Sequence, residues 1–193
     1  MLIKRFLCCA FLLVVLICLY GCPFESEFPL SQSSEAIIDT QLLGKWKLEP
    51  QKGEEPGTLM IYQFNDHEYL ILAKGEDEKD TDGIRAFSTT IDGHTFLNIQ
   101  DIKGPGEKKQ NWEFLNYSFS NNKLVIKVVL GEIFEKKKCA SSKELFTCMQ
   151  ENLTNKALYN QDLKQIFSRI DEWQNNSSLL CTLFKKQTSV IFM

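Results

Sequence analysis

The sequence predicts a mainly β protein: an antiparallel meander that closes into a roughly eight-stranded barrel, with two α-helices before the last strand. Three observations support this. Apolar residues alternate with polar ones in short runs between residues 42 and 130, turn-forming residues separate these runs, and helical spacing of apolar residues begins only after Phe134. Because an open meander of seven strands leaves two exposed edges, closure into a barrel is expected.

The first strand is expected at residues 42–49. Its alternation places one set of side chains on a single face of a half-buried strand: Leu42, Gly44, Trp46 and Leu48. The opposite face carries Lys45, Lys47 and Glu49, which suit solvent.

Three hairpins follow. Residues 57–64 and 67–73 flank Asn65-Asp66, residues 84–91 and 94–100 flank Asp92-Gly93, and residues 112–119 and 123–130 flank the turn at residues 120–122. Asn, Asp and Gly tolerate the left-handed backbone that tight hairpin turns require. A two-residue turn in the first hairpin would pair Tyr62 with Tyr69.

Two helices and a final strand complete the domain. Ser141 and Glu144 form a capping-box pattern at the start of the first helix. The second helix is predicted from an amphipathic spacing of residues: Tyr159, Leu163, Ile166, Phe167, Ile170 and Trp173. Residues 180–186 are expected to return as the last strand and close the barrel beside the first.

The N-terminus has the features of a signal peptide. Lys4 and Arg5 precede an uncharged, mostly apolar run at residues 6–20. As a helix this run would be about 22 Å long, shorter than the roughly 30 Å hydrocarbon core of a bilayer, so we interpret it as a cleaved signal. Cys22 follows this run; in an ordinary secretory signal it would be incidental, and the alternative is that it carries a lipid.

Residues Leu19-Tyr20-Gly21-Cys22 resemble the lipobox of bacterial lipoproteins. The resemblance implies that residues 1–21 are removed and that Cys22 carries a diacylglyceryl thioether and an N-acyl chain. Several acyl chains would make membrane anchoring stable. Because Pro23 rather than Asp follows the cysteine, the resemblance also implies sorting to the outer membrane, with the protein facing the periplasm.

The remaining chain divides into a tether and one domain. Residues 22–35 contain two prolines, several serines and no periodicity, which predicts a flexible, lipid-anchored tether. Residues 36–193 are expected to form a single barrel domain with C-terminal helices.

The Gly44-Lys45-Trp46 triplet on an opening strand, followed by a meander and a late helix, resembles the G-x-W signature of lipocalins and related calycin barrels. In that family the tryptophan packs across the closed end of the barrel and a basic residue of the last strand lies over its ring. The resemblance therefore implies a structural barrel-end group of Gly44, Trp46 and Lys185, and an interior that holds a single small ligand.

The sequence offers few candidates for other chemistry. A net charge of −3 supplies no basic field for nucleic acid. We expect no metal site, because neither His67 nor His94 has a metal-ligating residue at suitable spacing and the acidic run Glu78-x-Asp80-x-Asp82-Gly83 lacks the terminal glutamate of a calcium loop. No catalytic motif is found, and no cofactor is expected beyond the lipid on Cys22.

The cysteines leave two readings open. Cys139 and Cys148 are the first choice for a disulfide, because such a bond would join the capped helix to the segment before it. The alternative is that these residues and Cys181 are buried thiols.

These observations lead to one main hypothesis and two others. The main one is a non-enzymatic envelope lipoprotein that binds a small apolar molecule or an envelope component. The second is a protein-protein interaction module whose contact surface includes the acidic loop from Glu76 to Asp82. The third is a hydrolase or isomerase that acts at the barrel entrance with His67 or His94.

Overall fold

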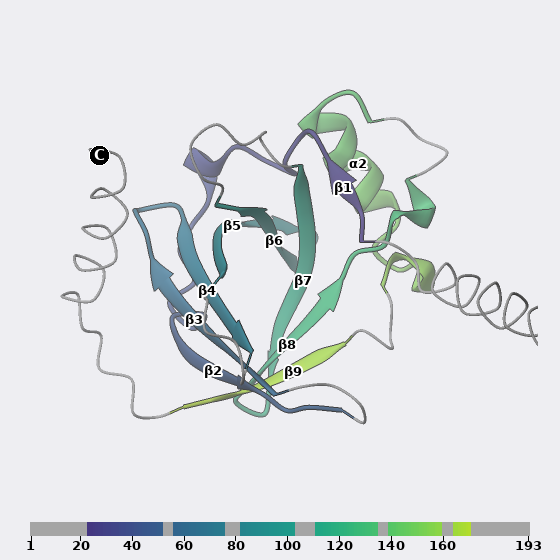
Figure 1. The fold of residues 1–193 in the computed structure, drawn as a ribbon. Coiled ribbons are helices and arrows are strands. Elements are labelled where there is room, and N and C mark those ends of the chain that lie inside the picture. Colours follow the sequence, from purple (N-terminus) through teal and green to yellow (C-terminus); the bar gives the residue numbers. More distant parts are fainter. Residues whose placement is uncertain are drawn as a thin grey trace, which may run out of the picture.

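The computed structural model describes residues 23–51, 56–75, 82–102, 111–134, 139–159 and 164–170. Within these ranges eight antiparallel strands close into a barrel, and one extra strand pairs with its wall (Figure 1). The predicted mainly β fold and the antiparallel barrel are therefore confirmed.

The barrel strands are β2 (Gly44–Leu48), β3 (Gly57–Gln63), β4 (Tyr69–Gly75), β5 (Asp82–Ile91), β6 (His94–Asp101), β7 (Trp112–Ser120), β8 (Lys123–Val128) and β9 (Gln165–Arg169). Strands β2 to β8 pair in sequence order except across one gap, between β2 and β8. Strand β9 fills this gap by pairing antiparallel with both neighbours, and so closes the barrel.

The prediction of a second helix across residues 159–173 is wrong. Residues Gln165–Arg169 form strand β9, and the described part of the chain contains a single α-helix, which precedes it. In β9 Phe167 lies in the barrel core and its neighbour Ser168 bonds to Glu49 outside it, as successive residues of a strand do. The spacing of apolar residues over so short a stretch fits either a helix or a strand. Hydrogen bonding of β9 to both β2 and β8 decides for the strand. The predicted final strand at residues 180–186 lies outside the described residues, and β9 takes the closing position.

Two of the three predicted hairpin turns are confirmed. Asp92 and Gly93 have φ values of 46° and 81°, and Asn121 and Asn122 have 51° and 60°. Both turns thus place two residues in the left-handed region, as the tightest hairpins require. Ser120 belongs to β7 and not to the turn.

The register of the first hairpin differs from the prediction. Tyr62 pairs with Leu70, and Gln63 pairs with Tyr69. The backbone N–H groups of Phe64 and Asn65 both donate to the Glu68 carbonyl. The connection between the strands is therefore one residue longer than the predicted two-residue turn. A shift of one residue turns a side chain to the other face. Tyr69 therefore lies inside the barrel, and Tyr62 points away from it.

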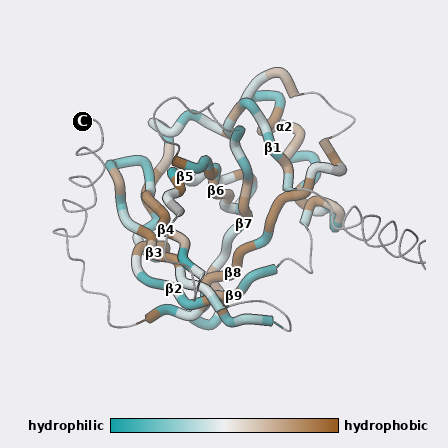
Figure 2. Tube along the Cα trace, in the orientation of Figure 1, coloured by the Kyte–Doolittle hydropathy of each residue, from teal (hydrophilic) through white to brown (hydrophobic). Residues whose placement is uncertain are grey.

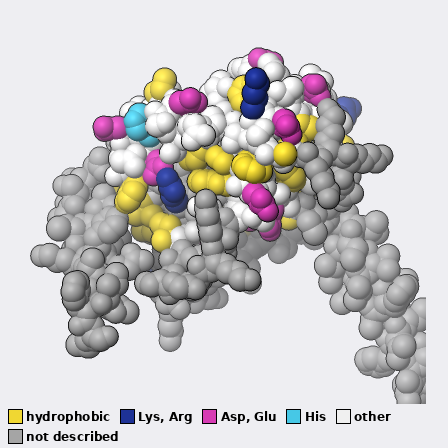
Figure 3. Space-filling model, turned by 90° about the horizontal axis from the view of Figure 1, so that it is seen from above, with side chains coloured by type: hydrophobic (Ala, Val, Ile, Leu, Met, Phe, Trp, Pro, Cys, Tyr) yellow, Lys and Arg dark blue, Asp and Glu magenta, His cyan; other side chains and the backbone are white. Residues whose placement is uncertain are grey.

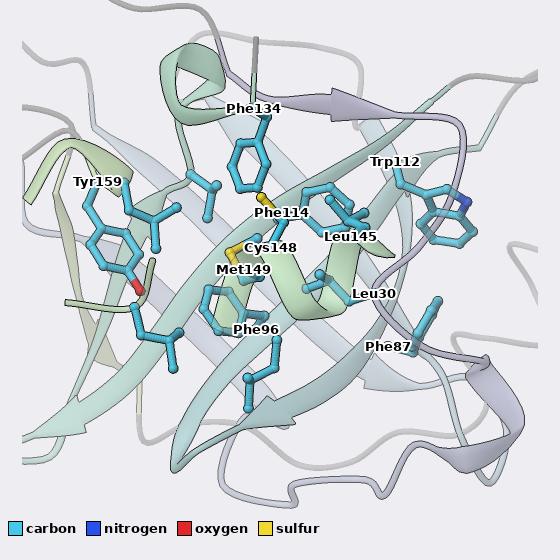
Figure 4. Packing of buried hydrophobic residues seen from close by; sticks show 14 of the residues in the cluster. Leu30, Phe87, Phe96, Trp112, Phe114, Phe134, Leu145, Cys148, Met149 and Tyr159 are labelled. Carbon is cyan, nitrogen blue, oxygen red and sulfur yellow. The ribbon is translucent and has the colours of Figure 1, made fainter. Parts of the chain in front are cut away.

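Hydrophobic side chains form two separate cores, one on each face of the barrel wall. The inner core lies within the barrel and includes Leu42, Trp46, Ile61, Tyr69, Ile71, Leu97, Tyr117, Leu124 and Phe167. The outer core lies between the wall and the elements that cover it, and includes Phe87, Phe96, Phe114, Leu145, Cys148, Met149 and Tyr159 (Figure 4). Apolar positions on both faces of β5, β6 and β7 are thus explained by a covered outer face. The brown stretches along β3 and β4 in Figure 2 belong to strands that contribute no residue to this outer core.

Helix α2 (Ser142–Glu151) covers the outer core and begins at the predicted capping box. The Ser141 hydroxyl accepts a hydrogen bond from the Glu144 N–H at 3.3 Å, and the Glu144 carboxylate accepts one from the Ala140 N–H at 2.9 Å. The buried residues of the helix are Leu145, Cys148 and Met149, which share one face. Short 3-10 turns flank this region: η1 (Ser33–Glu35), η2 (Gly131–Ile133) and η3 (Lys156–Leu158).

The described residues of the predicted tether, 23–35, belong to the folded domain. Strand β1 (Glu25–Ser26) pairs with β7, and the ring of Phe24 stacks on Phe134 at 4.0 Å between centroids. Leu30 is 2% exposed, and its N–H donates to the Asn98 side chain at 2.7 Å. The prediction failed because these apolar residues have no strand or helix period, although they fill the outer core.

Replacing Leu30 by alanine tests whether this segment is structural. We expect Leu30→Ala to lower the free energy of unfolding by about 2–5 kcal/mol, because it leaves a cavity in the outer core. Exposed Gln32 is the matched control, and Gln32→Ala should leave stability unchanged. Urea denaturation of both variants is the measurement, and equal stability of Leu30→Ala and the unaltered protein would support a free tether instead.

Candidate functional site

One end of the barrel is closed by an aromatic and cationic pair. The indole of Trp46 is 1% exposed, and its N–H donates to the Leu42 carbonyl at 2.8 Å. The guanidinium of Arg169 lies over the ring, 4.4 Å from its centroid. The same guanidinium donates to the carbonyls of Leu43, at 2.8 Å, and of Gln41. Strand β9 is thereby joined to the chain that enters β2.

Gly44 makes this arrangement sterically accessible. Its φ is +134°, a value that residues with a side chain rarely adopt, and a Cβ placed there would lie 2.8 Å from a terminal nitrogen of Arg169. Glycine at this position therefore allows the unusual backbone conformation and leaves room for the Arg169 guanidinium. Gly44, Trp46 and Arg169 form one unit, which we call the closed end.

The sequence identified two of these three residues. Gly44 and Trp46 lie at the closed end, whereas Lys185 lies outside the described residues. Arg169 was missed because residues 159–173 were read as a helix. The expectation of a basic residue on the last strand was the signal that could have found it, because Gln165–Arg169 itself shows no regular alternation of polar and apolar residues.

A polar cluster lies beneath the segment that crosses the closed end. The Asp39 N–H donates to the Tyr69 hydroxyl oxygen at 2.6 Å, and the Tyr117 hydroxyl donates to the Asp39 carboxylate at 3.1 Å. Burial, followed by the nearby Asp39 charge, raises the pKa of Tyr117 far above its usual range. Both tyrosines thus serve as neutral hydrogen-bonding groups, and the next buried residue of the segment, Leu42, packs into the inner core.

The opposite end of the barrel has a different lining. Three inward-facing hydrophobic side chains are only partly buried toward this end: Ile84, Ile99 and Leu115. Glu113 pairs with Ile99 across β6 and β7 and therefore shares their inward face. Polar and apolar groups thus meet within the barrel wall at this end.

Glu113 has an unfavourable electrostatic environment. Burial raises the pKa of its carboxyl group above the usual value, and the neighbouring carboxylates of Glu25 and Asp101 raise it further. Within the described ranges, no cation or hydrogen-bond donor is among the groups that shift it. Such uncompensated carboxyl groups are more common at functional sites than elsewhere, although structural networks also produce them. Glu113 was not singled out in the sequence.

A solvent-open hollow of about 760 Å³ lies outside the closed end. Its lining includes Trp46, Arg169, Lys123 and the turn at Asn121 and Asn122. The two cations already have partners, because Arg169 bonds to backbone carbonyls and Lys123 forms an ion pair with Glu49 at 2.7 Å. This hollow therefore offers little unused binding capacity.

The histidines do not form a site together. The Nδ1 atom of His67 lies 2.8 Å from the Ala36 carbonyl oxygen, and His94 is an exposed residue at the start of β6. No group of three or more His, Cys, Asp or Glu side chains in the described residues is arranged to hold a metal. In the view of Figure 3, acidic side chains are spread around a central group of hydrophobic ones, with few Lys or Arg between them. Most of the acidic loop from Glu76 to Asp82 lies outside the described residues.

The predicted disulfide between Cys139 and Cys148 is not formed. Cys148 is a free thiol, 3% exposed, in the outer core, and Cys139 packs against the same cluster. The alternative reading, a buried thiol, describes Cys148. Cys181 lies outside the described residues.

Cys22 also lies outside the described residues, directly before Pro23. Among the described residues no helix has the length and hydropathy needed to span a membrane. Comparison with known proteins finds no matching family model, no matching curated protein and no matching solved structure.

A Gly44→Ala variant tests the closed end. We expect it to lower the free energy of unfolding by about 2 kcal/mol or more, because the added methyl group meets Arg169 and the backbone conformation disfavours alanine. Gly57 is a suitable control, since a Cβ there would make only an ordinary contact, at 3.5 Å. Thermal unfolding followed by circular dichroism would compare the two, and equal melting temperatures would contradict this role of Gly44.

Two glutamates should affect stability with opposite sign. The hydrogen bond from Arg85 lowers the pKa of Glu68 in the folded protein, so its carboxylate stabilises the fold above its unfolded pKa, and this contribution is lost as the pH falls. The raised pKa of Glu113 means that stability decreases as the pH rises through its unfolded and then its folded pKa.

At pH 7 we therefore expect Glu68→Gln to be less stable than the unaltered protein and Glu113→Gln to be more stable. The Glu113 difference should shrink near about pH 3, below the usual pKa of a glutamate, whereas the Glu68 difference should shrink less there because the pKa of Glu68 is lowered in the folded protein. Denaturant titrations at both pH values measure this. A Glu113→Gln variant that is less stable at pH 7 would contradict the assigned environment.

Proposed function

We propose that this protein is a lipid-anchored, lipocalin-like barrel of the bacterial cell envelope that binds one small apolar molecule without catalysing its conversion. The observation that carries the proposal is the difference between the two barrel ends. One is closed by Trp46 and Arg169, whereas at the other Ile99 and Leu115 face inward on the same side of the sheet as the carboxyl group of Glu113. Ligand entry through the second end follows from this asymmetry.

An eight-stranded barrel with an apolar lining is compatible with a ligand of this class. Eight-stranded barrels have interiors that side chains fill or that hold one small ligand. The inward-facing Ile84, Ile99 and Leu115 offer apolar contact near the entrance. Glu113 adds a polar group, so a ligand with an amine or hydroxyl group near it would supply the missing donor.

The proposed anchor is Cys22. Its support is the lipobox pattern at residues 19–22 and the basic, then apolar segment before it. The attached acyl chains, and not a spanning helix, would hold the domain at the outer membrane, on its periplasmic side. An interaction with an envelope protein is the second function that the sequence suggested.

The proposal is tested with protein extracted from its native membrane under non-denaturing conditions. Intact mass spectrometry should show a chain that begins at an acylated Cys22 and carries a small apolar molecule, and Cys22→Ala should lose the acyl chains. An unmodified chain that is cut elsewhere would overturn the anchor. An acylated chain that neither carries a small molecule nor binds an apolar fluorescent probe would overturn the ligand.

A matched pair of variants locates the ligand. Leu115 and Ser118 lie on the same strand and on opposite faces, so Leu115→Trp fills the interior whereas Ser118→Trp adds bulk outside. We expect Leu115→Trp to weaken binding of an apolar fluorescent probe about tenfold or more and Ser118→Trp to leave it unchanged. Equal affinities for both variants would show that the probe binds elsewhere.

A further inference from the structure

The chain that follows Cys22 is held against the barrel from its first residue. Pro23 forms a bridge with Leu130, and the Phe24 N–H donates to the Val129 carbonyl at 3.0 Å. The Phe24 ring is stacked between Phe114 and Phe134, at 5.7 and 4.0 Å between centroids. An anchor on Cys22 would therefore have almost no slack.

The same stretch of chain reaches the proposed ligand entrance. Glu25 pairs with Glu113, the inward-facing carboxyl group of that end. Three residues of extended chain span at most about 11 Å, which limits the distance from Cys22 to Glu25. The headgroup layer of one leaflet is itself about 5–8 Å thick. The entrance would thus lie close to the surface that holds the anchor.

The surface around Pro23 is formed by η2 and η3. The Leu130 N–H donates to the Leu158 carbonyl at 3.0 Å, and Val129 pairs with Tyr159. This joins η3 to the residues after β8 that Pro23 and Phe24 contact. Lys156 is exposed in η3, and the ammonium of Lys127 lies 5.3 Å from the Tyr159 ring centroid. Lysines with apolar stems and aromatic neighbours suit a headgroup layer, because the stem can lie along apolar groups while the charge stays in water.

We propose that the flank made of Pro23, η2 and η3 is a membrane-contact surface, which seats the barrel on the anchoring bilayer with its entrance beside the headgroups. This inference rests on the proposed lipidation of Cys22. It also narrows the ligand class, because an entrance beside the headgroups favours an amphiphile that partitions in the bilayer over a molecule dissolved in the periplasm.

Photo-crosslinking of the full-length acylated protein in vesicles of phosphatidylethanolamine and phosphatidylglycerol tests the orientation. Benzoylphenylalanine replaces Lys156 on the proposed contact flank. As a control it replaces Asp66, an exposed residue in the loop between β3 and β4, which lie across the barrel from β7 and β8. We expect several-fold more lipid crosslinking at position 156 than at position 66. Equal yields would overturn the inference.

A second variant distinguishes a fixed orientation of the barrel on the membrane from anchoring by the acyl chains alone. A Gly/Ser linker of about 12 residues between Cys22 and Pro23, with a root-mean-square length of about 20 Å, keeps the acyl chains but adds slack. Crosslinking at position 156 should fall several-fold, and an unchanged yield would overturn the claim that the short connection seats the barrel. Intact mass before each experiment shows whether Cys22 is acylated. An unmodified chain would overturn the proposed anchor itself, whereas an acylated chain without preferential crosslinking would overturn only the orientation.

Discussion

The double pairing of β9 is the constraint on which the rest of the barrel depends. A strand of five residues, Gln165–Arg169, hydrogen-bonds to β2 on one side and β8 on the other, and so turns an open sheet into a closed one. Arg169 adds a link from this strand to the Trp46 ring and to the chain that enters β2. Closure of the barrel separates an interior from an outer surface. The division into an inner and an outer core, and the difference between the two barrel ends, both follow from this closure.

The sequence predicted what is set by local pattern and turn chemistry. Asp92-Gly93 and the capping box at Ser141 work through neighbouring backbone groups, so their residue types suffice to identify them. Strand β9 could not be identified in this way, because its pairing partners are distant in the sequence and its apolar residues also fit a helix. The register of the first hairpin failed for a related reason, since the Glu68 carbonyl accepts hydrogen bonds that only the folded loop defines.

The candidate site was harder to predict than the fold. Gly44 and Trp46 were found through a short motif, whereas Glu113 lies on a strand with apolar residues on both faces. Which face is inside depends on where α2 and residues 23–35 pack, and the latter have no periodicity. The burial of Leu30 and Phe114 in one outer core shows how non-local contacts decide which carboxyl group points into the barrel.

Strand β1, although only two residues long, covers an edge of the sheet that would otherwise be open. Pairing between β7 and β8 begins at Leu115, so the start of β7 at Trp112 and Glu113 would present unpaired backbone groups where β8 has diverged. Glu25 and Ser26 pair with this short stretch and cover it. An uncovered strand edge can recruit a strand from a neighbouring molecule. β1 would thus act as a built-in guard against edge-to-edge polymerisation, and the proposed lipid anchor would make such a guard more important because it would concentrate copies in two dimensions.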